Sequence, residues 1–340
     1  MFALDATRLQ RVADQFQLPA FRLKQIREWI FDRYINDFYQ MSNLPKALRQ
    51  SLAEKYRITE SIIVSSRETG EGTVKLLIQY PDGAKIETVI MGYRDWSSAC
   101  LSTQVGCAMG CTFCATGPMG IQRNLTTEEM VEQLWHCHRY AVEHSLKPVR
   151  NMVLMGIGEP LANFSNVVGL INVANNPEYF DMGQRRITLS TVGLVPQIDS
   201  LAQLNLSITL AISLHAPNDR LRQQLIPSSG KYPLQDLVTA CRNYTTMTGR
   251  RVTFEYLMLD GVNDQDRHAK ELARLLKGMN CLVNLIPFNK VPGTTYRPSK
   301  RMNAFRKLLQ VYGLNVTIRR SLGTEIDAAC GQLRRGTPGC

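Results

Sequence analysis

Three cysteines within eight consecutive residues restrict what this chain can fold into. Cys107, Cys111 and Cys114 have the spacing C-x3-C-x2-C, and a glycine precedes each of the first two. A loop that glycines make flexible can turn three sulfurs toward one centre. Structural zinc usually takes four ligands, often from two C-x2-C pairs, and this sequence has no second pair. Three thiolates on an iron–sulfur cluster leave one iron free for another ligand, which is the interpretation we favour.

Beyond residue 93 the chain alternates predicted strands with predicted helices. The apolar runs predict strands over residues 99–105, 151–155, 186–190, 207–213, 251–259, 282–287 and 315–320. A capping box at residues 126–129 and the helical periodicity predict helices over 126–144, 264–277 and 300–312. Repeated β–α units predict an α/β fold with a parallel sheet, and six or seven of them predict a full or partial barrel.

Two smaller parts precede this region. Residues 1–57 are predicted to be helical, because apolar residues recur at three- and four-residue spacing. Residues 58–93 change to a two-residue period, which predicts a small antiparallel β unit. Its strands are expected at 61–66, 73–80 and 84–91. We therefore divide the chain into a helical module at 1–57, a β unit at 58–93, a (β/α) barrel at 94–333 and a loose tail at 334–340.

Composition narrows the class of protein. Hydrophobic residues make up 44% of the 340 residues, so wholesale disorder is excluded. The net charge of +11 favours a polyanionic partner, and a basic helical module makes contact with RNA plausible. No apolar run reaches the ~18 residues of a membrane helix, and the first residues lack a signal-peptide core. Nine cysteines are an odd number, which suits a reducing cytoplasm, so we expect a cytoplasmic protein.

Polar or reactive residues follow most of the predicted barrel strands, where a (β/α) barrel builds its active site. The strand-end segments are 107–114, Gly156-Ile157-Gly158-Glu159-Pro160, Ser190-Thr191, Ser213-Leu214-His215, Pro287-Phe288-Asn289 and Asp327-Ala328-Ala329-Cys330-Gly331. Each also has an ordinary explanation: Gly156 and Gly158 lack the third glycine of a dinucleotide fingerprint and could simply let a backbone approach a ligand closely. A free cysteine such as Cys330 is most often a buried apolar residue. Their concentration at one mouth favours a functional site.

The sequence motifs and their order along the chain resemble those of the RlmN family of radical S-adenosylmethionine enzymes. The resemblance covers nearly the whole chain. It rests on Gln104-Val105-Gly106-Cys107, Phe113-Cys114-Ala115-Thr116-Gly117, Arg123-Asn124-Leu125-Thr126, Gly158-Glu159-Pro160-Leu161, Ser213-Leu214-His215-Ala216-Pro217-Asn218, Asn284-Leu285-Ile286-Pro287-Phe288-Asn289 and Asp327-Ala328-Ala329-Cys330-Gly331-Gln332-Leu333. The resemblance implies a partial barrel of the radical S-adenosylmethionine type. It also implies methylation of carbon 2 of adenine in 23S rRNA and tRNA, and hence a role in rRNA and tRNA processing.

The resemblance further assigns roles to individual residues. Cys107, Cys111 and Cys114 would hold a [4Fe–4S] cluster whose free iron binds the amino and carboxylate groups of S-adenosylmethionine. Cys330 would carry the methyl group, and Cys100 would be its thiol partner. The residues expected to line the cofactor pocket are Gly158, Glu159, Ser190, Ser213, Leu214, His215 and Asn289. Glu87 would be the proton acceptor, although a lone strand glutamate is usually just solvent-facing.

The implied chemistry explains the unusual set of cysteines. Carbon 2 of adenine is electron-poor and does not attack a sulfonium methyl as a nucleophile. The methyl would first be transferred to Cys330, and a radical made from a second S-adenosylmethionine would activate it for addition to the ring. Glu87 would then remove the ring proton, and Cys100 would attack Cys330 to release the product and form a disulfide. An external electron donor and an external thiol reductant would complete the cycle of an enzyme that we expect to be monomeric.

Three alternatives stay open at this point. Cfr-like enzymes methylate carbon 8 of the same ribosomal adenine with the same cysteines, but Pro160 and Pro287-Phe288 look like the RlmN branch. A non-catalytic iron–sulfur protein that binds RNA would need neither Cys330 nor Cys100. A zinc-binding protein is the third alternative.

Overall fold

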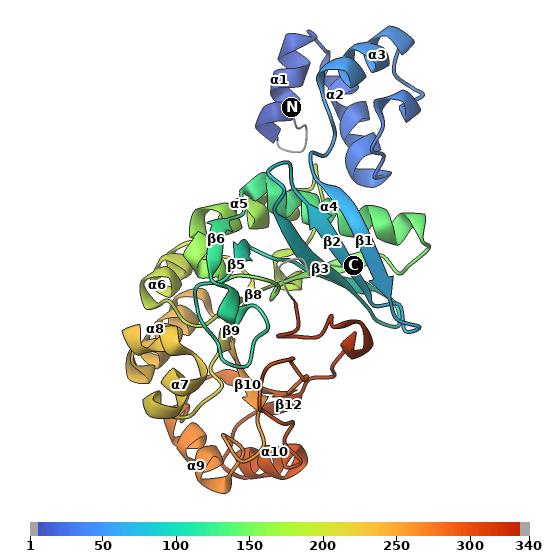
Figure 1. The fold of residues 1–340 in the computed structure, drawn as a ribbon. Helices are drawn as coiled ribbons and strands as arrows, with labels where there is room; N and C mark the ends of the chain where they lie inside the picture. The colour runs from blue at the N-terminus through green and yellow to red at the C-terminus, as the bar shows by residue number, and fades with distance from the viewer. Residues whose placement is uncertain (1–5, 334–340) are drawn as a thin grey trace.

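One ten-stranded sheet runs through the computed structural model, which describes residues 6–333 (Figure 1). Its strand order is β1-β2-β3-β4-β7-β8-β9-β10-β11-β12, so β1 and β12 are its edges and the barrel is open. All neighbouring pairs from β4 to β12 are parallel. The parallel strands are β4 (Ser97–Cys100), β7 (Val149–Leu154), β8 (Ile187–Thr191), β9 (Thr209–Ser213), β10 (Val252–Met258), β11 (Cys281–Pro287) and β12 (Val316–Ile318). The predicted α/β fold with a partial barrel is confirmed.

The antiparallel strands expected before the barrel are present, and they extend the same sheet. They are β1 (Ile62–Glu68), β2 (Val74–Gln79) and β3 (Lys85–Gly92). β3 pairs antiparallel with β4, and Val89 lies opposite Cys100. The β unit is therefore continuous with the barrel.

The strand predicted at 99–105 is instead two strands. β4 ends at Cys100, and β5 (Gln104–Gly106) pairs with β6 (Ile121–Asn124) in a separate two-stranded sheet. The break has a clear cause, because the Gln133 side chain bonds both the N–H and the carbonyl of Ser102, at 2.9 and 3.0 Å. These bonds occupy backbone groups that a continuous ladder would use. The segment between these two strands, residues 107–120, carries the three clustered cysteines and is called the cysteine loop below.

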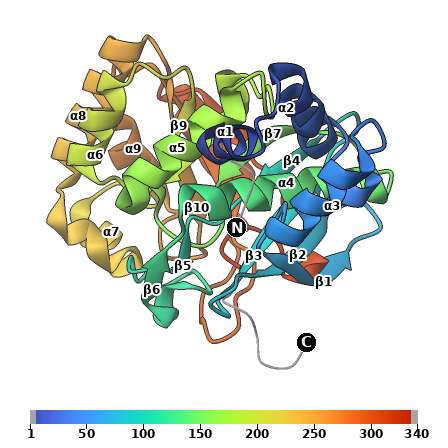
Figure 2. The ribbon, with the colours of Figure 1, turned by 90° about the horizontal axis from the view of Figure 1, so that it is seen from above.

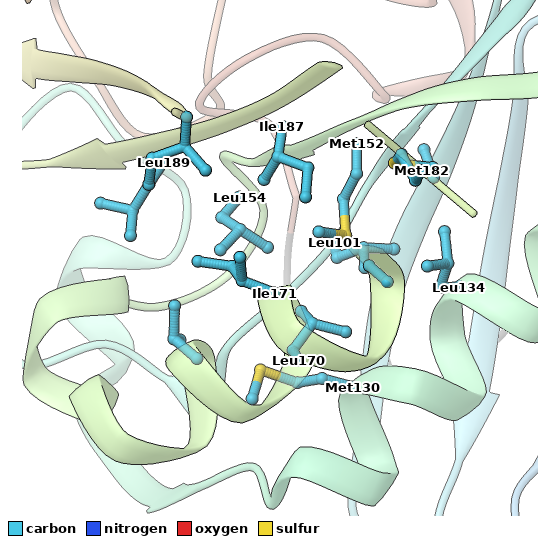
Figure 3. Close-up of a cluster of buried hydrophobic side chains, with 14 of the residues drawn as sticks. Leu101, Met130, Leu134, Met152, Leu154, Leu170, Ile171, Met182, Ile187 and Leu189 are labelled. Atoms are coloured by element: carbon cyan, nitrogen blue, oxygen red, sulfur yellow. The ribbon is translucent and has the colours of Figure 1, made fainter. Parts of the chain in front are cut away.

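Helices cover the outer face of the sheet (Figure 2). They are α4 (Thr127–Glu143), α5 (Phe164–Asn175), α6 (Val195–Gln203), α7 (Asp219–Leu225), α8 (Leu234–Thr248), α9 (Asp266–Leu275) and α10 (Met302–Val311). The predicted capping box at Thr126 and Glu129 opens α4. Apolar side chains of the strands, such as Met152 and Leu189, meet those of α4 and α5 in the core (Figure 3). None of the helices within residues 6–333 is long and apolar enough to span a membrane.

The N-terminal helices pack on α4 rather than standing apart from the barrel. α1 (Ala6–Gln15) and α2 (Ala20–Arg27) are followed by a π-helical turn, Glu28–Asp32, and by α3 (Lys46–Lys55). The indole of Trp135 on α4 donates to the Ile30 carbonyl at 2.7 Å, and Tyr34 hydrogen-bonds His138 at 2.8 Å. The predicted tail at 334–340 and the first five residues of the predicted helical module at 1–57 lie outside the described part of the chain.

A buried carboxylate fixes the connection between this helical module and β1. Glu132 on α4 accepts the N–H groups of Glu60 and Ser61 at 3.1 and 2.8 Å, and it also bonds the Ser61 hydroxyl. Burial raises the pKa of Glu132 to about 7, and these hydrogen bonds oppose the rise. The module is thus held in a fixed position relative to the sheet.

Gly106→Ala tests the packing that shapes the cysteine loop. Gly106 has φ +83°, and a Cβ there would overlap the Gly120 carbonyl. Gly83 has nearly the same φ, +81°, but nothing within 4 Å, so Gly83→Ala is the matched control. We expect the control to lose about 1–2 kcal/mol of unfolding free energy from the left-handed conformation. Gly106→Ala should lose about 1–3 kcal/mol more from overlap. Equal losses in urea unfolding would contradict this account.

Candidate active site

All three clustered cysteines line one cavity of about 160 Å³ at the carboxyl ends of the parallel strands. The loop that carries them is held by its backbone. The Cys107 N–H donates to the Gly120 carbonyl at 2.9 Å, and the Thr112 N–H donates to the Leu225 carbonyl at 3.0 Å. The predicted site residues that share this cavity are Cys107, Cys111, Cys114, Gly158, Glu159, Ser190, Ser213, His215 and Cys330.

The cysteine arrangement fits an iron–sulfur cluster better than a single metal ion. Within residues 6–333, no three His, Cys, Asp or Glu side chains gather closely enough to hold one ion. A cluster does not need such convergence, because each thiolate binds a different iron. Burial raises the pKa of all three thiols, that of Cys107 to about 11, so thiolates here need a cationic partner. The donor set therefore fits a cluster held by three cysteines.

The glycines after β7 serve close packing within the protein. A Cβ on Gly156 would lie 2.7 Å from the Ser102 hydroxyl, and a Cβ on Gly158 would lie 2.7 Å from the Thr103 hydroxyl. The neighbour that comes close to these glycines in the structure is thus the segment after β4. This tight fit fixes the loop, and the next residue, Glu159, lines the larger cavity.

Glu159 is a fixed, buried carboxylate at the cavity. One oxygen accepts the Leu161 N–H at 3.0 Å and the other accepts the Val192 N–H at 2.8 Å. Burial raises its pKa to about 6, while hydrogen bonds from Thr191 and these backbone groups oppose the rise. A carboxylate held in this way can bind an ammonium group by a charge-assisted hydrogen bond.

The ends of β8 and β9 add neutral polar groups. The hydroxyls of Ser190 and Ser213 lie 3.5 Å apart. The Nδ1 atom of His215 accepts the Leu257 N–H at 3.0 Å, and burial lowers the His215 pKa to about 3. The ring is therefore neutral, with its proton on Nε2. The side chain of Leu214 is fully buried in the core and does not line the cavity.

A second cavity, of about 30 Å³, is lined by the two cysteines with predicted catalytic roles. Cys100 and Cys330 both line it, and both are free thiols. Asn289 lies here rather than in the larger cavity, and its side-chain amide donates to the Cys330 carbonyl at 3.4 Å. Because Cys330 lines both cavities, it connects the clustered cysteines with Cys100.

Hydrogen bonds from two sides fix the segment that carries Cys330. The Ala115 N–H, in the cysteine loop, donates to the Gly331 carbonyl at 2.7 Å, and the Thr116 hydroxyl donates to the Leu333 carbonyl at 2.7 Å. On the other side, the Gln332 side chain donates to the Lys290 carbonyl at 3.0 Å. The position of Cys330 is therefore coupled to the cysteine loop.

Glu87 lines neither of the two cavities, yet it shares a sheet face with Cys100. Val89 lies opposite Cys100, and side chains two residues apart on a strand point to the same face. The Glu87 carboxylate pairs with the Lys75 ammonium at 3.0 Å, and this ammonium also donates to the Asp327 carbonyl at 3.2 Å. Lys75 thus links the predicted proton acceptor to the segment that carries Cys330.

Arg319 is a site residue that the sequence analysis missed. It lines both cavities, and its guanidinium contacts the Met155 sulfur at 3.2 Å. The charge of Cys330 raises its pKa most, against the effect of burial, and Glu255 and Cys100 raise it further. The predicted strand at 315–320 hid this role, because β12 ends at Ile318 and leaves Arg319 at the strand's carboxyl end. A shorter strand prediction would have revealed it.

The sequence matches two family models. Residues 101–273 match the radical SAM superfamily, and residues 1–58 match the ribosomal RNA large subunit methyltransferase N-terminal domain. The second match falls on the helical module and the first on the larger part of the parallel sheet.

Known relatives match nearly the whole chain. A probable dual-specificity RNA methyltransferase RlmN of Desulforamulus reducens is 44% identical, over 98% of this chain and 95% of that protein. One from Geobacillus kaustophilus is 45% identical, over 92% of this chain and 86% of that protein. The crystal structure of a radical SAM methyltransferase from Sphaerobacter thermophilus superposes with a TM-score of 0.91 at 46% identity, covering 96% of this chain and 97% of that one.

Replacing Arg319 should change the reactivity of Cys100. Burial and, to a smaller extent, the charge of Cys330 raise the pKa of Cys100 to about 12, and Arg319 opposes this rise. In Arg319→Met the pKa should therefore rise, and a rise of about one unit lowers the thiolate fraction about tenfold. We expect Cys100 alkylation at mildly alkaline pH, followed by peptide mass spectrometry, to slow by about that factor. Arg319→Lys should keep the wild-type rate, as should Arg320→Met, which removes an exposed arginine paired with Glu71. Equal rates in Arg319→Met and Arg320→Met would refute the role of Arg319.

Proposed function

Because the chain belongs to the RlmN family of radical S-adenosylmethionine RNA methyltransferases, we propose that it methylates carbon 2 of adenine in 23S rRNA and tRNA through a methyl group on Cys330. The observation that supports this most is that Cys330 lines both cavities. A methyl carrier must reach the cofactor on one side and the releasing thiol on the other. Cys330 has the clustered cysteines on one side and Cys100 on the other.

The larger cavity would hold the cofactors. Cys107, Cys111 and Cys114 would bind a [4Fe–4S] cluster, which together with S-adenosylmethionine supplies the one-electron chemistry that breaks an unactivated carbon–hydrogen bond. Glu159 carries a buried carboxylate suited to the ammonium group of the amino acid moiety. The remaining cofactor contacts that we propose come from Gly158, Ser190, Ser213, the backbone of Leu214, and His215.

Asn289 has a different proposed task. Its amide bonds the Cys330 carbonyl, so it would orient the methyl-carrying segment beside the cofactor. Arg319 would act on the same segment through charge, because a cation stabilises a nearby thiolate. The thiolate is the form of Cys330 that accepts a methyl group by displacement.

Release of the product would use Cys100. Its sulfur attacks the sulfur of Cys330, so that an S–S bond forms as the bond between Cys330 and the RNA-bound carbon breaks. The released carbon takes up one proton, which balances the proton that the Cys100 thiol loses. The adduct made by radical addition also carries one unpaired electron, and a cluster held by Cys107, Cys111 and Cys114 would accept this electron as the product is released. An external thiol reductant must then reduce the disulfide. The small cavity shared by the two thiols brings them to one place for this step.

Glu87 would accept the proton from the adenine ring. It lies on the face of β3 that Cys100 shares, and Lys75 holds its carboxylate beside the segment that carries Cys330. A positioned carboxylate is a common general base. The two residues of the β3–β4 pair would thus act in succession on the same RNA adduct.

Mass spectrometry of two protein samples tests this proposal. Native protein should carry one extra methyl group on the Cys330 peptide. Cys100→Ala should accumulate RNA covalently attached at Cys330, because the releasing thiol is gone. The matched control is Cys281→Ala, which removes a buried cysteine at the opposite end of β11 and should leave turnover unchanged.

The RNA product must also be identified. Nucleoside analysis should find 2-methyladenosine, and finding 8-methyladenosine would overturn the proposed position. An unmodified Cys330 in native protein, or adduct-free Cys100→Ala protein, would overturn the methyl-cysteine route.

RNA affinity should depend steeply on salt, because the chain has a net charge of +11. If about 6–10 phosphates are contacted, affinity falls about 10³–10⁵-fold between about 50 and 200 mM salt. Fluorescence anisotropy with labelled RNA measures this slope. A flat response would show that the basic charge does not contribute to binding.

A further inference from the structure

Two aromatic side chains stack at the tip of the β3–β4 hairpin. The Tyr93 N–H donates to the Trp96 carbonyl at 2.9 Å, so these residues close the turn. Their ring centroids are 4.1 Å apart, and the ring planes differ by 19°. The Tyr93 side chain is also 40% exposed, which leaves much of its surface open to solvent.

The aromatic pair stands at the edge of the cavity that holds Cys100 and Cys330. Tyr93 lines this cavity together with both thiols and Arg319. Burial raises the pKa of Tyr93, Arg319 lowers it, and Cys330 and Cys100 raise it further. Tyr93 thus lines the cavity while part of the residue remains in solvent.

Stabilisation of the hairpin does not account for this placement. Aromatic cross-strand pairs do stabilise antiparallel strands. The hairpin is already fixed, because β3 pairs with both β2 and β4 and Gly92 packs against the Gly72 backbone. The placement beside the two thiols instead suggests contact with a ligand.

The surroundings of the pair suit a nucleic acid. Arg94 and Arg320 are exposed beside it. The acidic residues nearby are Asp95 in the turn and Glu71, which pairs with Arg320 at 2.9 Å. Arginines bind phosphates, whereas aromatic rings stack on bases of any identity because every base has a π-face. The cavity of about 30 Å³ has the volume of about one water molecule, so a base at Tyr93 lies at its mouth and not inside it.

We propose that Tyr93 and Trp96 form a stacking platform for the unpaired RNA base that flanks the target adenine. The target ring must reach the Cys330 sulfur, and the half-exposed Tyr93 lines the same small cavity as Cys330, which leaves Tyr93 to the neighbouring base. The identity of the ligand as RNA rests on the proposed function. Stacking of this base positions the target adenine, and the two aromatic side chains do not take part in the chemistry.

Binding measurements with matched variants test the platform. A short stem–loop RNA with an unpaired adenine is compared with two RNAs that are abasic on one or the other side of it. Loss of one aromatic–base stack lowers affinity about 5- to 100-fold. We expect Tyr93→Ala to weaken binding of the intact RNA by such a factor. For the abasic RNA that lacks the stacking base, Tyr93→Ala and the wild type should have the same affinity. Tyr93→Phe should bind normally, as should Tyr312→Ala, which removes a 44% exposed tyrosine at the end of α10.

Tryptophan fluorescence of the holoenzyme gives an independent measurement. The chain has three tryptophans, and Trp29 and Trp135 are only 8% and 0% exposed. RNA should therefore quench mainly Trp96, and Trp96→Phe should remove the quenching. The platform is overturned if Tyr93→Ala binds and methylates all RNAs like the wild type, or if RNA binds without changing the emission.

The outcomes separate the platform from the proposed function. Normal methylation by Tyr93→Ala at an unchanged KM would refute the platform and leave the proposed function intact. Quenching of Trp96 and weaker binding by Tyr93→Ala, without any methylated adenine, would support the platform and refute the proposed function. The absence of any RNA binding would refute both.

Discussion

The hydrogen bond between Ala115 and Gly331, 2.7 Å long, joins the cysteine loop to the segment that carries Cys330. Such a bond contributes only about 1 kcal/mol, so it cannot hold the segment alone. The Thr116 bond to the Leu333 carbonyl and the packing of Leu333 and Ala328 against β3 and β4 reinforce it. The two halves of the site, which lie far apart along the chain, keep their relative position through this small set of contacts.

Two arginines supply positive charge on different sides of the site. Arg222 is 1% exposed and donates to the carbonyls of Ser213 and Leu214 at 3.2 and 3.3 Å, near Cys111 and Glu159. Arg319 stands near Cys330 and Cys100 instead. Burying a charged group is unfavourable unless an opposite charge or hydrogen bonds compensate for it. The thiols and carboxylates of the site are therefore distributed between these two arginines and Lys75, which pairs with Glu87, instead of facing one cation.

Periodicity and strand-end position predicted much of the fold and the place of the site. Apolar strands with polar residues at their ends located Glu159, Ser190 and Ser213, because parallel strands bring their carboxyl ends to one edge. The break between β4 and β5 was hidden, since it depends on the Gln133 side chain from a distant helix. Lys75 was missed for the same physical reason, because Glu87 and Asp327 become its neighbours only in three dimensions. Arg319 was missed because the predicted strand at 315–320 ran past the end of β12 at Ile318.

The antiparallel register of β3 and β4 makes the length of this hairpin as important as its composition. Glu87 and Cys100 face the same side only because Val89 lies opposite Cys100. Inserting or deleting one residue between Glu87 and Cys100 within either strand would turn one of these two side chains to the other face of the sheet. On that face, Thr88 approaches Cys137 of α4. The strands should therefore accept many substitutions but few changes in length, and the turn at residues 93–96 should be the part of the hairpin that accepts insertions.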